Sequence, residues 1–260
     1  MKQYRSIAIT GASSGIGEAL ALAYAAPGMR LALNGRDRAR LDAVVGACRA
    51  KGADAHGSAF DVTDRLACLA WIGDCERAGP LDLVVANAGV GLEGKSDLGF
   101  EEAMRQTLTI NIDGVLNTVL PALSAMRARR TGQIALVASL ASFIGLPHSP
   151  AYNGSKAAVR VWGESLRLNM AQEGVGVSVI CPGFVISRLT ARNKFPMPFL
   201  MTAEHSATII KRGLARNKAR IAYPWQTRAA VWLGQVLPAG LTELLLRPAA
   251  RAANPQRPGA

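Results

Sequence analysis

The sequence predicts one doubly wound α/β domain, with a parallel sheet of about seven strands and helices on both faces. Half of its 260 residues are apolar and 18% are charged, which is a globular composition in a chain long enough for one large core. Short runs of Val, Ile and Leu alternate with segments of helical apolar period. These runs contain few polar residues, as expected for parallel strands that helices cover on both sides.

The predicted elements follow one another up to Pro182 without a linker or a repeat. We expect strands over residues 5–10, 29–34, 53–60, 81–86, 133–138 and 175–181. We expect helices after residue 15, over 38–50, 63–77 and 101–129, and around Tyr152. Pro121 should kink or divide the long fourth helix, because proline has no N–H to donate.

The domain is expected to occupy residues 1–247, with a substrate lid over 188–215 and a basic, apolar extension over 216–247. Residues 248–260 are rich in Ala, Pro and Arg and are expected to be a disordered tail. The start of the chain has no secretory pattern, and no run of about 18 apolar residues predicts a membrane-spanning helix. Four scattered cysteines are typical of a reduced, cytoplasmic protein, and three histidines without ligand spacing predict no metal site.

The charge is concentrated at the C-terminal end. Residues 188–260 hold twelve of the 30 Lys and Arg but two of the 18 Asp and Glu, so they carry +10 of the net +12. Basic residues beside Trp and Leu clusters are compatible with a peripheral membrane contact, an oligomer contact or a self-packed extension. No nucleic-acid recognition motif accompanies the charge, so a nucleic-acid partner is not expected.

A glycine-rich turn follows the first predicted strand and opens the first helix. Gly11, Gly15 and Gly17 allow a tight turn and a close approach to a pyrophosphate. Ser13, Ser14 and Ile16 lie in the same turn, at the helix N-terminus, where backbone amides and the helix dipole attract phosphate. This position in a strand–turn–helix unit predicts a dinucleotide site in a Rossmann-type fold.

The end of the second strand indicates which dinucleotide binds. A carboxylate there would hold the ribose hydroxyls of NAD, whereas Gly35 occupies that position and Arg36 follows it. A guanidinium binds a 2′-phosphate well, so NADP is favoured over NAD. Asp37 leaves an alternative, since it could pair with Arg36 or take the hydroxyls itself.

Tyr152 and Lys156 are four residues apart, so on a helix they share one face with Cβ atoms about 6 Å apart. Lowering a phenol pKa from about 10 to about 7 needs roughly 4 kcal/mol, which a neighbouring ammonium can help to supply. Taken alone, the pair is ordinary amphipathic helix. Ser139 upstream and the glycine turn favour a chemical role instead.

Seven motifs stand in an order and spacing that resemble the short-chain dehydrogenase/reductase family over about residues 5–190. They are Thr10-Gly11-x-x-x-Gly15-x-Gly17, Asp61-Val62, Asn87-Ala88-Gly89, Asn111, Ser139, Tyr152-x-x-x-Lys156 and Pro182-Gly183.

The resemblance implies a role for each catalytic residue. Tyr152 would exchange a proton with the substrate oxygen, and Lys156 would lower the pKa of that phenol and bind the nicotinamide ribose. Ser139 would hydrogen-bond the reacting oxygen, and Asn111 would hold a water that links Lys156 to solvent.

The resemblance also assigns the other cofactor contacts. Asp61 and Val62 would lie at the adenine, and Asn87, Ala88 and Gly89 would line the cofactor. The loop with Pro182, Gly183, Val185 and Ser187 would hold the nicotinamide carboxamide, with Ser187 where the family usually has threonine. The family further implies a homodimer or homotetramer packed through the helix after Glu101 and the helix around Tyr152.

The expected function is therefore NADP(H)-dependent interconversion of a carbonyl and an alcohol. Two Phe, two Met and a Leu over residues 195–201 predict an apolar wall for a lipid, steroid or aromatic substrate, unless they fill the core under the lid. The alternative is a cofactor-bound regulator or scaffold of the same fold without significant turnover.

Overall fold

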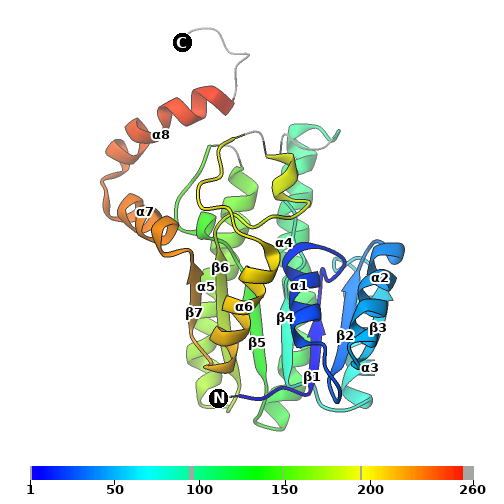
Figure 1. Cartoon of the computed structure of the whole chain (residues 1–260). Helices are drawn as coiled ribbons and strands as arrows, with labels where there is room; N and C mark the ends of the chain where they lie inside the picture. The colour runs from blue at the N-terminus through cyan, green and yellow to red at the C-terminus, as the bar shows by residue number, and fades with distance from the viewer. Residues whose placement is uncertain (1, 94–96, 148, 194, 254–260) are drawn as a thin grey trace.

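The computed structural model describes residues 2–93, 97–147, 149–193 and 195–253. A seven-stranded parallel sheet forms its centre, in the order β3-β2-β1-β4-β5-β6-β7 (Figure 1). The strands are β1 (Ser6–Ile9), β2 (Arg30–Gly35), β3 (Asp54–Ala59), β4 (Leu83–Ala86), β5 (Gln133–Val137), β6 (Gly176–Pro182) and β7 (Arg220–Tyr223).

Strands β1, β4, β5 and β6 are buried along their whole length. Both of their faces are covered, which explains why these segments read as continuous apolar runs. The chain builds outward from β1 to β3 and then crosses back to β4 on the other side of β1. This reversal leaves a crevice at the carboxyl ends of β1 and β4, where parallel sheets of this kind bind ligands.

Three helices cover each face of the sheet. On one face, α1 (Gly15–Tyr24), α2 (Arg38–Ala50) and α6 (Ala203–Ala215) pack on a core that includes Leu20, Leu41 and Ile210. On the other face lie α3 (Arg65–Arg77), α4 (Phe100–Ala128) and α5 (Pro150–Ala171), with Ile72, Val119 and Val159 in the core. The predicted doubly wound fold is thus confirmed.

Two sequence expectations differ from the structure. Helix α4 is one continuous helix with Pro121 inside it, so of the two expected effects of this proline, division of the helix does not occur and a kink stays a prediction. The seventh strand, β7, was not located from sequence because its four residues precede Pro224 and follow a basic helix. It pairs with β6 at the edge of the sheet, where a short strand suffices.

The C-terminal part divides differently from the expected lid and extension. Helix α6 is packed against the sheet, so the segment that covers the cleft ends near Met201, which forms a bridge with Val185. The covering segment contains the short 3₁₀ helix η2 (Thr190–Arg192).

Beyond β7, α7 (Trp225–Val236) and α8 (Ala239–Ala253) project from one side of the body, past the carboxyl ends of the strands (Figure 1). Helix α8 continues into the expected tail, of which residues 254–260 lie outside the described range. Across the described ranges, the structure has no helix with both the length and the apolar character needed to cross a membrane.

Candidate active site

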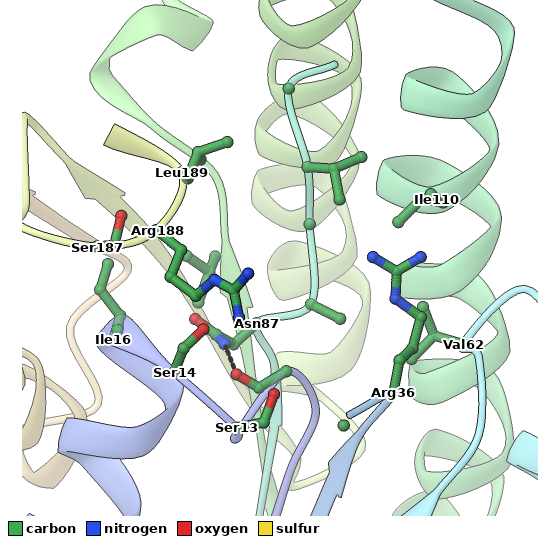
Figure 2. A pocket seen from close by; sticks show the side chains of 18 of the residues that line it. Ser13, Ser14, Ile16, Arg36, Val62, Asn87, Ile110, Ser187, Arg188 and Leu189 are labelled. Atoms are coloured by element: carbon green, nitrogen blue, oxygen red, sulfur yellow. Dashed lines mark hydrogen bonds between the residues drawn. The ribbon is translucent and has the colours of Figure 1, made fainter. Parts of the chain in front are cut away.

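A cleft of about 360 Å³ lies at the carboxyl ends of the central strands. Its lining comes from the loops after β1, β2, β3, β4, β5 and β6, from the first turns of α5, and from Arg40 on α2 and Ile110 on α4. Figure 2 shows Arg36 and Val62 on one side of this cleft and Ile16, Ser187 and Leu189 on the other, with Asn87 between them. All the predicted site residues except Gly17 and Asn111 line it.

The glycine turn brings the backbone of β1 against that of β4. Gly11 has a φ of +65°, and a Cβ on it would lie 2.8 Å from the Ala88 Cα. A Cβ on Gly17 would collide with the Gly11 carbonyl oxygen, so Gly17 lies behind the lining and permits the close turn. Helix α1 starts directly after Ser14, whose side chain makes no capping hydrogen bond, so the first amides of α1 are left for a phosphate.

Thr10 and Asn87 hold the ends of β1 and β4 together. The Thr10 hydroxyl accepts hydrogen bonds from the backbone N–H groups of Asn87 (3.1 Å) and Ala88 (3.2 Å). The Asn87 side-chain amide donates to the carbonyl of Thr10 at 2.9 Å and to that of Gly11 at 3.2 Å. Asn87 therefore braces the central strands while lining the cleft.

Arg36 and Asp61 face each other after β2 and β3. Arg36 Nη1 lies 3.3 Å from Asp61 Oδ2, in an ion pair that is largely exposed. Burial would raise the pKa of Asp61, but hydrogen bonds from Thr63 and the charge of Arg36 outweigh it and lower that pKa.

Asp37, the alternative ligand for ribose hydroxyls, is engaged elsewhere. Its Oδ1 accepts from the Arg40 backbone N–H at 3.0 Å and caps α2, and its Oδ2 pairs with Arg40 Nη2 at 3.0 Å. Arg40 also lines the cleft, and its Nε is buried with no hydrogen-bond partner among the described residues. Two guanidinium groups thus stand at this end of the cleft, and Arg40 is a residue that the sequence analysis did not single out.

The catalytic candidates meet at the other end. The side chains of Ser139 and Tyr152 both line the cleft and lie close enough for their interaction to lower the pKa of the phenol. Lys156 lies one turn along α5, with its Nζ 5.9 Å from the centroid of the Tyr152 ring. Lys156 is 3% exposed and donates to the Val137 carbonyl at 2.8 Å.

Burial dominates the pKa values of this pair. Burial raises the pKa of Tyr152, the hydrogen bond from Ser139 lowers it, and the nearby charge of Glu93 raises it further. Burial lowers the pKa of Lys156 to about 8, with Cys181 as a smaller, opposing influence. The expected lowering of the phenol pKa by Lys156 therefore stays a prediction.

Asn111 lies behind the cleft wall and is fully buried. Its Oδ1 accepts from the Val90 N–H at 2.8 Å, and its Nδ2 donates to the Val90 carbonyl and the Ser155 hydroxyl, each at 2.9 Å. Asn111 thereby ties α4 to α5 and to the segment after β4. Its predicted role in a water path to Lys156 is an expectation that the structure does not test.

The loop after β6 closes the remaining side. Gly183 donates its N–H to the Tyr223 carbonyl at 2.7 Å, which places Pro182 and Gly183 against β7. Ser187 N–H donates to the Thr190 hydroxyl at 2.9 Å, and Val185 is buried beside Met201. In Figure 2, Arg188 and Leu189 from this loop point into the cleft.

The apolar wall expected over residues 195–201 does not line the cleft. Phe199 and Leu200 are exposed, Met201 packs against the core, and Phe195 contacts Phe184 with ring centroids 6.0 Å apart. Leu92 and Leu189 provide the apolar lining near Tyr152 instead. His148, between Ser139 and Tyr152, lies outside the described residues.

Glu93 is a further residue near the site that the sequence analysis missed. It is buried and accepts the backbone N–H of Tyr152 at 2.9 Å. No local sequence pattern marked it, because the contact joins segments 59 positions apart in the chain.

The chain matches known proteins over most of its length. The family model for short chain dehydrogenase matches residues 5–195. An uncharacterized oxidoreductase of Myxococcus xanthus is 39% identical over 245 residues, which cover 94% of this chain and 97% of that protein. A putative ketoacyl reductase of the granaticin polyketide synthase of Streptomyces violaceoruber is 34% identical, over 71% of this chain and 69% of that protein.

Solved structures share the fold. A short-chain dehydrogenase from Sphingobium yanoikuyae in complex with NADPH superposes with a TM-score of 0.77 at 23% identity, covering 90% of this chain and 98% of the other. An actinorhodin polyketide ketoreductase with NADPH gives 0.73 at 26% identity, covering 84% and 94%. With the family model spanning the glycine turn, Ser139, Tyr152 and Lys156, the chain belongs to the short-chain dehydrogenase/reductase family and is an NAD(P)-dependent enzyme of it.

Proposed function

We propose that this protein is an NADP(H)-dependent oxidoreductase that interconverts a carbonyl and an alcohol, with Tyr152 as the general acid and base. One observation carries the proposal: Ser139, Tyr152 and Lys156 line the same cleft as the glycine turn of α1. A bound nicotinamide would supply or accept the hydride. The chain's own residues bind and orient the two reactants and move the proton.

In the reduction direction, the Tyr152 hydroxyl donates its proton to the oxygen of the substrate carbonyl as that oxygen becomes negative. The Ser139 hydroxyl, next to Tyr152, provides a second hydrogen bond at the same oxygen. Lys156 is held by the Val137 carbonyl, and its positive charge favours the phenolate that remains. In the oxidation direction the proton returns to Tyr152.

The preference for NADP over NAD is supported by the charges at the far end of the cleft. Arg36 and Arg40 line it, and Asp37 is already bonded to Arg40 and to the first turn of α2. A carboxylate with its oxygens engaged is a poor acceptor for ribose hydroxyls, whereas two guanidinium groups suit a 2′-phosphate.

We propose a hydrophobic carbonyl compound as the substrate. Leu92 and Leu189 make the cleft apolar near Tyr152, and apolar lining with few polar groups is typical of sites for such ligands. The similar ketoacyl and polyketide ketoreductases have names that describe carbonyl reduction, which agrees with this class.

The test is consumption of NADPH with a panel of ketones that ranges from small and polar to bulky and apolar. Tyr152→Phe should abolish turnover, whereas Tyr24→Phe should not. Tyr24 is a matched control, because it lies in the core away from the cleft and its hydroxyl has no partner among the described residues. Unchanged turnover in Tyr152→Phe would exclude the mechanism, and no turnover with any ketone would favour the regulator or scaffold.

For assembly, we propose a homodimer or homotetramer packed through α4 and α5. Leu120 on α4 and Val161 and Leu168 on α5 are large apolar side chains that stand exposed in one protomer. Exposed apolar side chains on two long helices favour packing against a second copy of the chain. Light scattering of the purified protein measures the state directly, and a strictly monomeric protein would exclude this packing.

We also propose a peripheral membrane contact through α7 and α8. On α7, Trp225, Trp232, Leu233 and Val236 recur at helical spacing and are all exposed, the two tryptophans by 73% and 62%. Leu241, Leu244 and Leu245 continue the exposed apolar surface on α8. Helices α7 and α8 carry Arg228, Arg247 and Arg251 against Glu243, and this positive excess complements anionic lipid headgroups.

Co-sedimentation with vesicles tests this contact. Vesicles with anionic phosphatidylglycerol should bind the protein, and vesicles of phosphatidylcholine alone should bind it less. Trp232→Glu should release it, and Leu66→Glu, a similar change at an exposed site on α3, should not. Equal binding by the two variants would exclude α7 as the contact.

A further inference from the structure

Glu93 is a buried carboxylate outside the set of residues described above as catalytic. It follows β4, is 4% exposed and does not belong to the cleft lining. Burying a charge is costly unless hydrogen bonds compensate for it. Glu93 has two: Oε1 accepts the Tyr152 backbone N–H at 2.9 Å, and Oε2 accepts from the Thr107 hydroxyl on α4 at 3.4 Å.

The Tyr152 N–H is one of the donors that the start of a helix leaves without a partner in the helix itself. Tyr152 is the third residue of α5, and the N-cap residue Ser149 makes no side-chain capping bond within the described residues. Glu93 therefore supplies the missing acceptor from a distant segment. Its negative charge also stands at the positive end of the helix dipole, where a carboxylate is stabilised.

We propose that Glu93 is the positioning residue of Tyr152: its carboxylate fixes the first turn of α5 and so holds the phenol beside Ser139. This inference rests on the proposed function, since it assumes that Tyr152 transfers the proton. The Thr107 hydroxyl orients the carboxylate and also accepts the Leu92 N–H at 3.3 Å. The same contacts thus fix Leu92, which lines the cleft near the phenol.

Glu93 has an electrostatic effect beside the geometric one. Its charge opposes ionisation of the phenol and raises the pKa of Tyr152, after the larger effect of burial. The described groups around the phenol are Glu93, Lys156 on α5, Ser139 after β5 and Arg188, which lines the same cleft, with Cys181 on β6 acting on Lys156. Of these, Glu93 is the carboxylate, so neutralising it should make the phenol easier to ionise.

Two variants separate position from charge. Glu93→Gln keeps an oxygen that accepts the Tyr152 N–H, and its amide can donate to the Thr107 hydroxyl, so the helix turn is retained and the charge is lost. Glu93→Ala loses both. Glu102→Gln is the matched control, because Glu102 is exposed at the start of α4 and bonds to Gln106.

The measurements are the pH dependence of alcohol oxidation with NADP⁺ and a spectroscopic titration of the phenol, taken as the difference between each protein and its Tyr152→Phe derivative. We expect Glu93→Gln to keep most of its kcat, with the acid limb of the rate profile and the phenol titration moved to lower pH. We expect Glu93→Ala to lose about tenfold to a hundredfold in kcat, as misplaced reacting groups do. Glu102→Gln should match the parent in both measurements.

The positioning role is overturned if Glu93→Ala keeps the parent's kcat, and the electrostatic effect is overturned if Glu93→Gln titrates at the same pH as the parent. If Glu93→Ala does not fold, a Glu93→Gln protein that loses tenfold or more in kcat overturns the positioning role, because the glutamine keeps the acceptor for the Tyr152 N–H. The phenol titration needs no turnover, so it reports on Glu93 even if Tyr152→Phe stays active and the proposed function fails.

Discussion

The buried charge of Lys156 should lower the free energy of unfolding of the protein. The lysine side chain is 3% exposed, and burial lowers its pKa to about 8. At neutral pH the lysine is nevertheless protonated, so the folded protein carries a poorly solvated ammonium. We predict that Lys156→Met abolishes activity and stabilises the protein near neutral pH.

The magnitude follows from the pKa. At about 1.4 kcal/mol per pH unit, a pKa lowered from 10.5 to about 8 corresponds to about 3 kcal/mol of unfavourable free energy when the group is charged. Methionine has a similar length but loses the hydrogen bond to the Val137 carbonyl, which costs about 1–2 kcal/mol. The net gain should be about 1–2 kcal/mol, or roughly 2–8 °C in Tm for a chain of this size.

The lowered pKa of Lys156 also determines whether the stability of the parent rises or falls with pH. Between about pH 8 and about pH 10.5 the unfolded chain binds a proton at Lys156 that the folded protein has lost, so parent stability rises with pH through this window. Below about pH 8, Lys156 is protonated in both the folded and the unfolded protein, so the full free-energy cost of burying its charge remains. The advantage of Lys156→Met should therefore be present at about pH 7 and disappear towards about pH 10.

Urea unfolding of both proteins without cofactor, at several pH values, measures this difference. Cofactor is left out because it would stabilise the parent by binding. A variant that is less stable than the parent at neutral pH, or whose advantage does not change with pH, would refute the reasoning about the buried ammonium.

Three further predictions concern Arg36 and Gly17 in the cofactor part of the cleft and the buried Asn111. Arg36→Ala should weaken NADPH binding by about tenfold to a hundredfold, the value of one charge-assisted hydrogen bond, and leave NADH binding unchanged. Titration of cofactor fluorescence measures both affinities, and Arg38→Ala, on the exposed face of α2, is the control. Equal losses of NADPH and NADH affinity in Arg36→Ala would contradict a role of Arg36 at the 2′-phosphate. Gly17→Ala should abolish cofactor binding and reduce stability, because its Cβ would meet the Gly11 carbonyl oxygen; normal NADPH binding by a folded variant would contradict this. Asn111→Ala should cost about 2–4 kcal/mol in urea unfolding, since it strands the buried backbone groups that its amide now satisfies, and a loss below about 1 kcal/mol would contradict that role.

The features that sequence predicted well depend on local backbone rules. The glycine turn needs positive φ angles at Gly11 and Gly15, which few other residues adopt, so its sequence is diagnostic. The predicted bounds of α2 agree with the structure because Asp37 caps the helix through the Arg40 N–H. These features could be identified without any knowledge of tertiary contacts.

The features that sequence missed depend on contacts between distant segments. Strand β7 is four residues long and exists because β6 offers an unpaired edge. Glu93 meets Tyr152 across 59 positions. Neither composition nor periodicity carries this information, because each contact is made only when the sheet has assembled.

The catalytic turn of α5 is attached to the sheet at points independent of the covering segment. Lys156 bonds to the Val137 carbonyl of β5, Tyr152 N–H bonds to Glu93 after β4, and Asn111 joins Ser155 to the same segment. None of these three hydrogen bonds is made by a residue of the covering segment after β6. The reacting groups can therefore stay fixed while residues 186–202 and the helices α7 and α8 differ between related proteins. Differences in substrate among relatives should accordingly map to these C-terminal segments, and exchange of residues 186–202 with those of a relative should change KM across the ketone panel more than kcat.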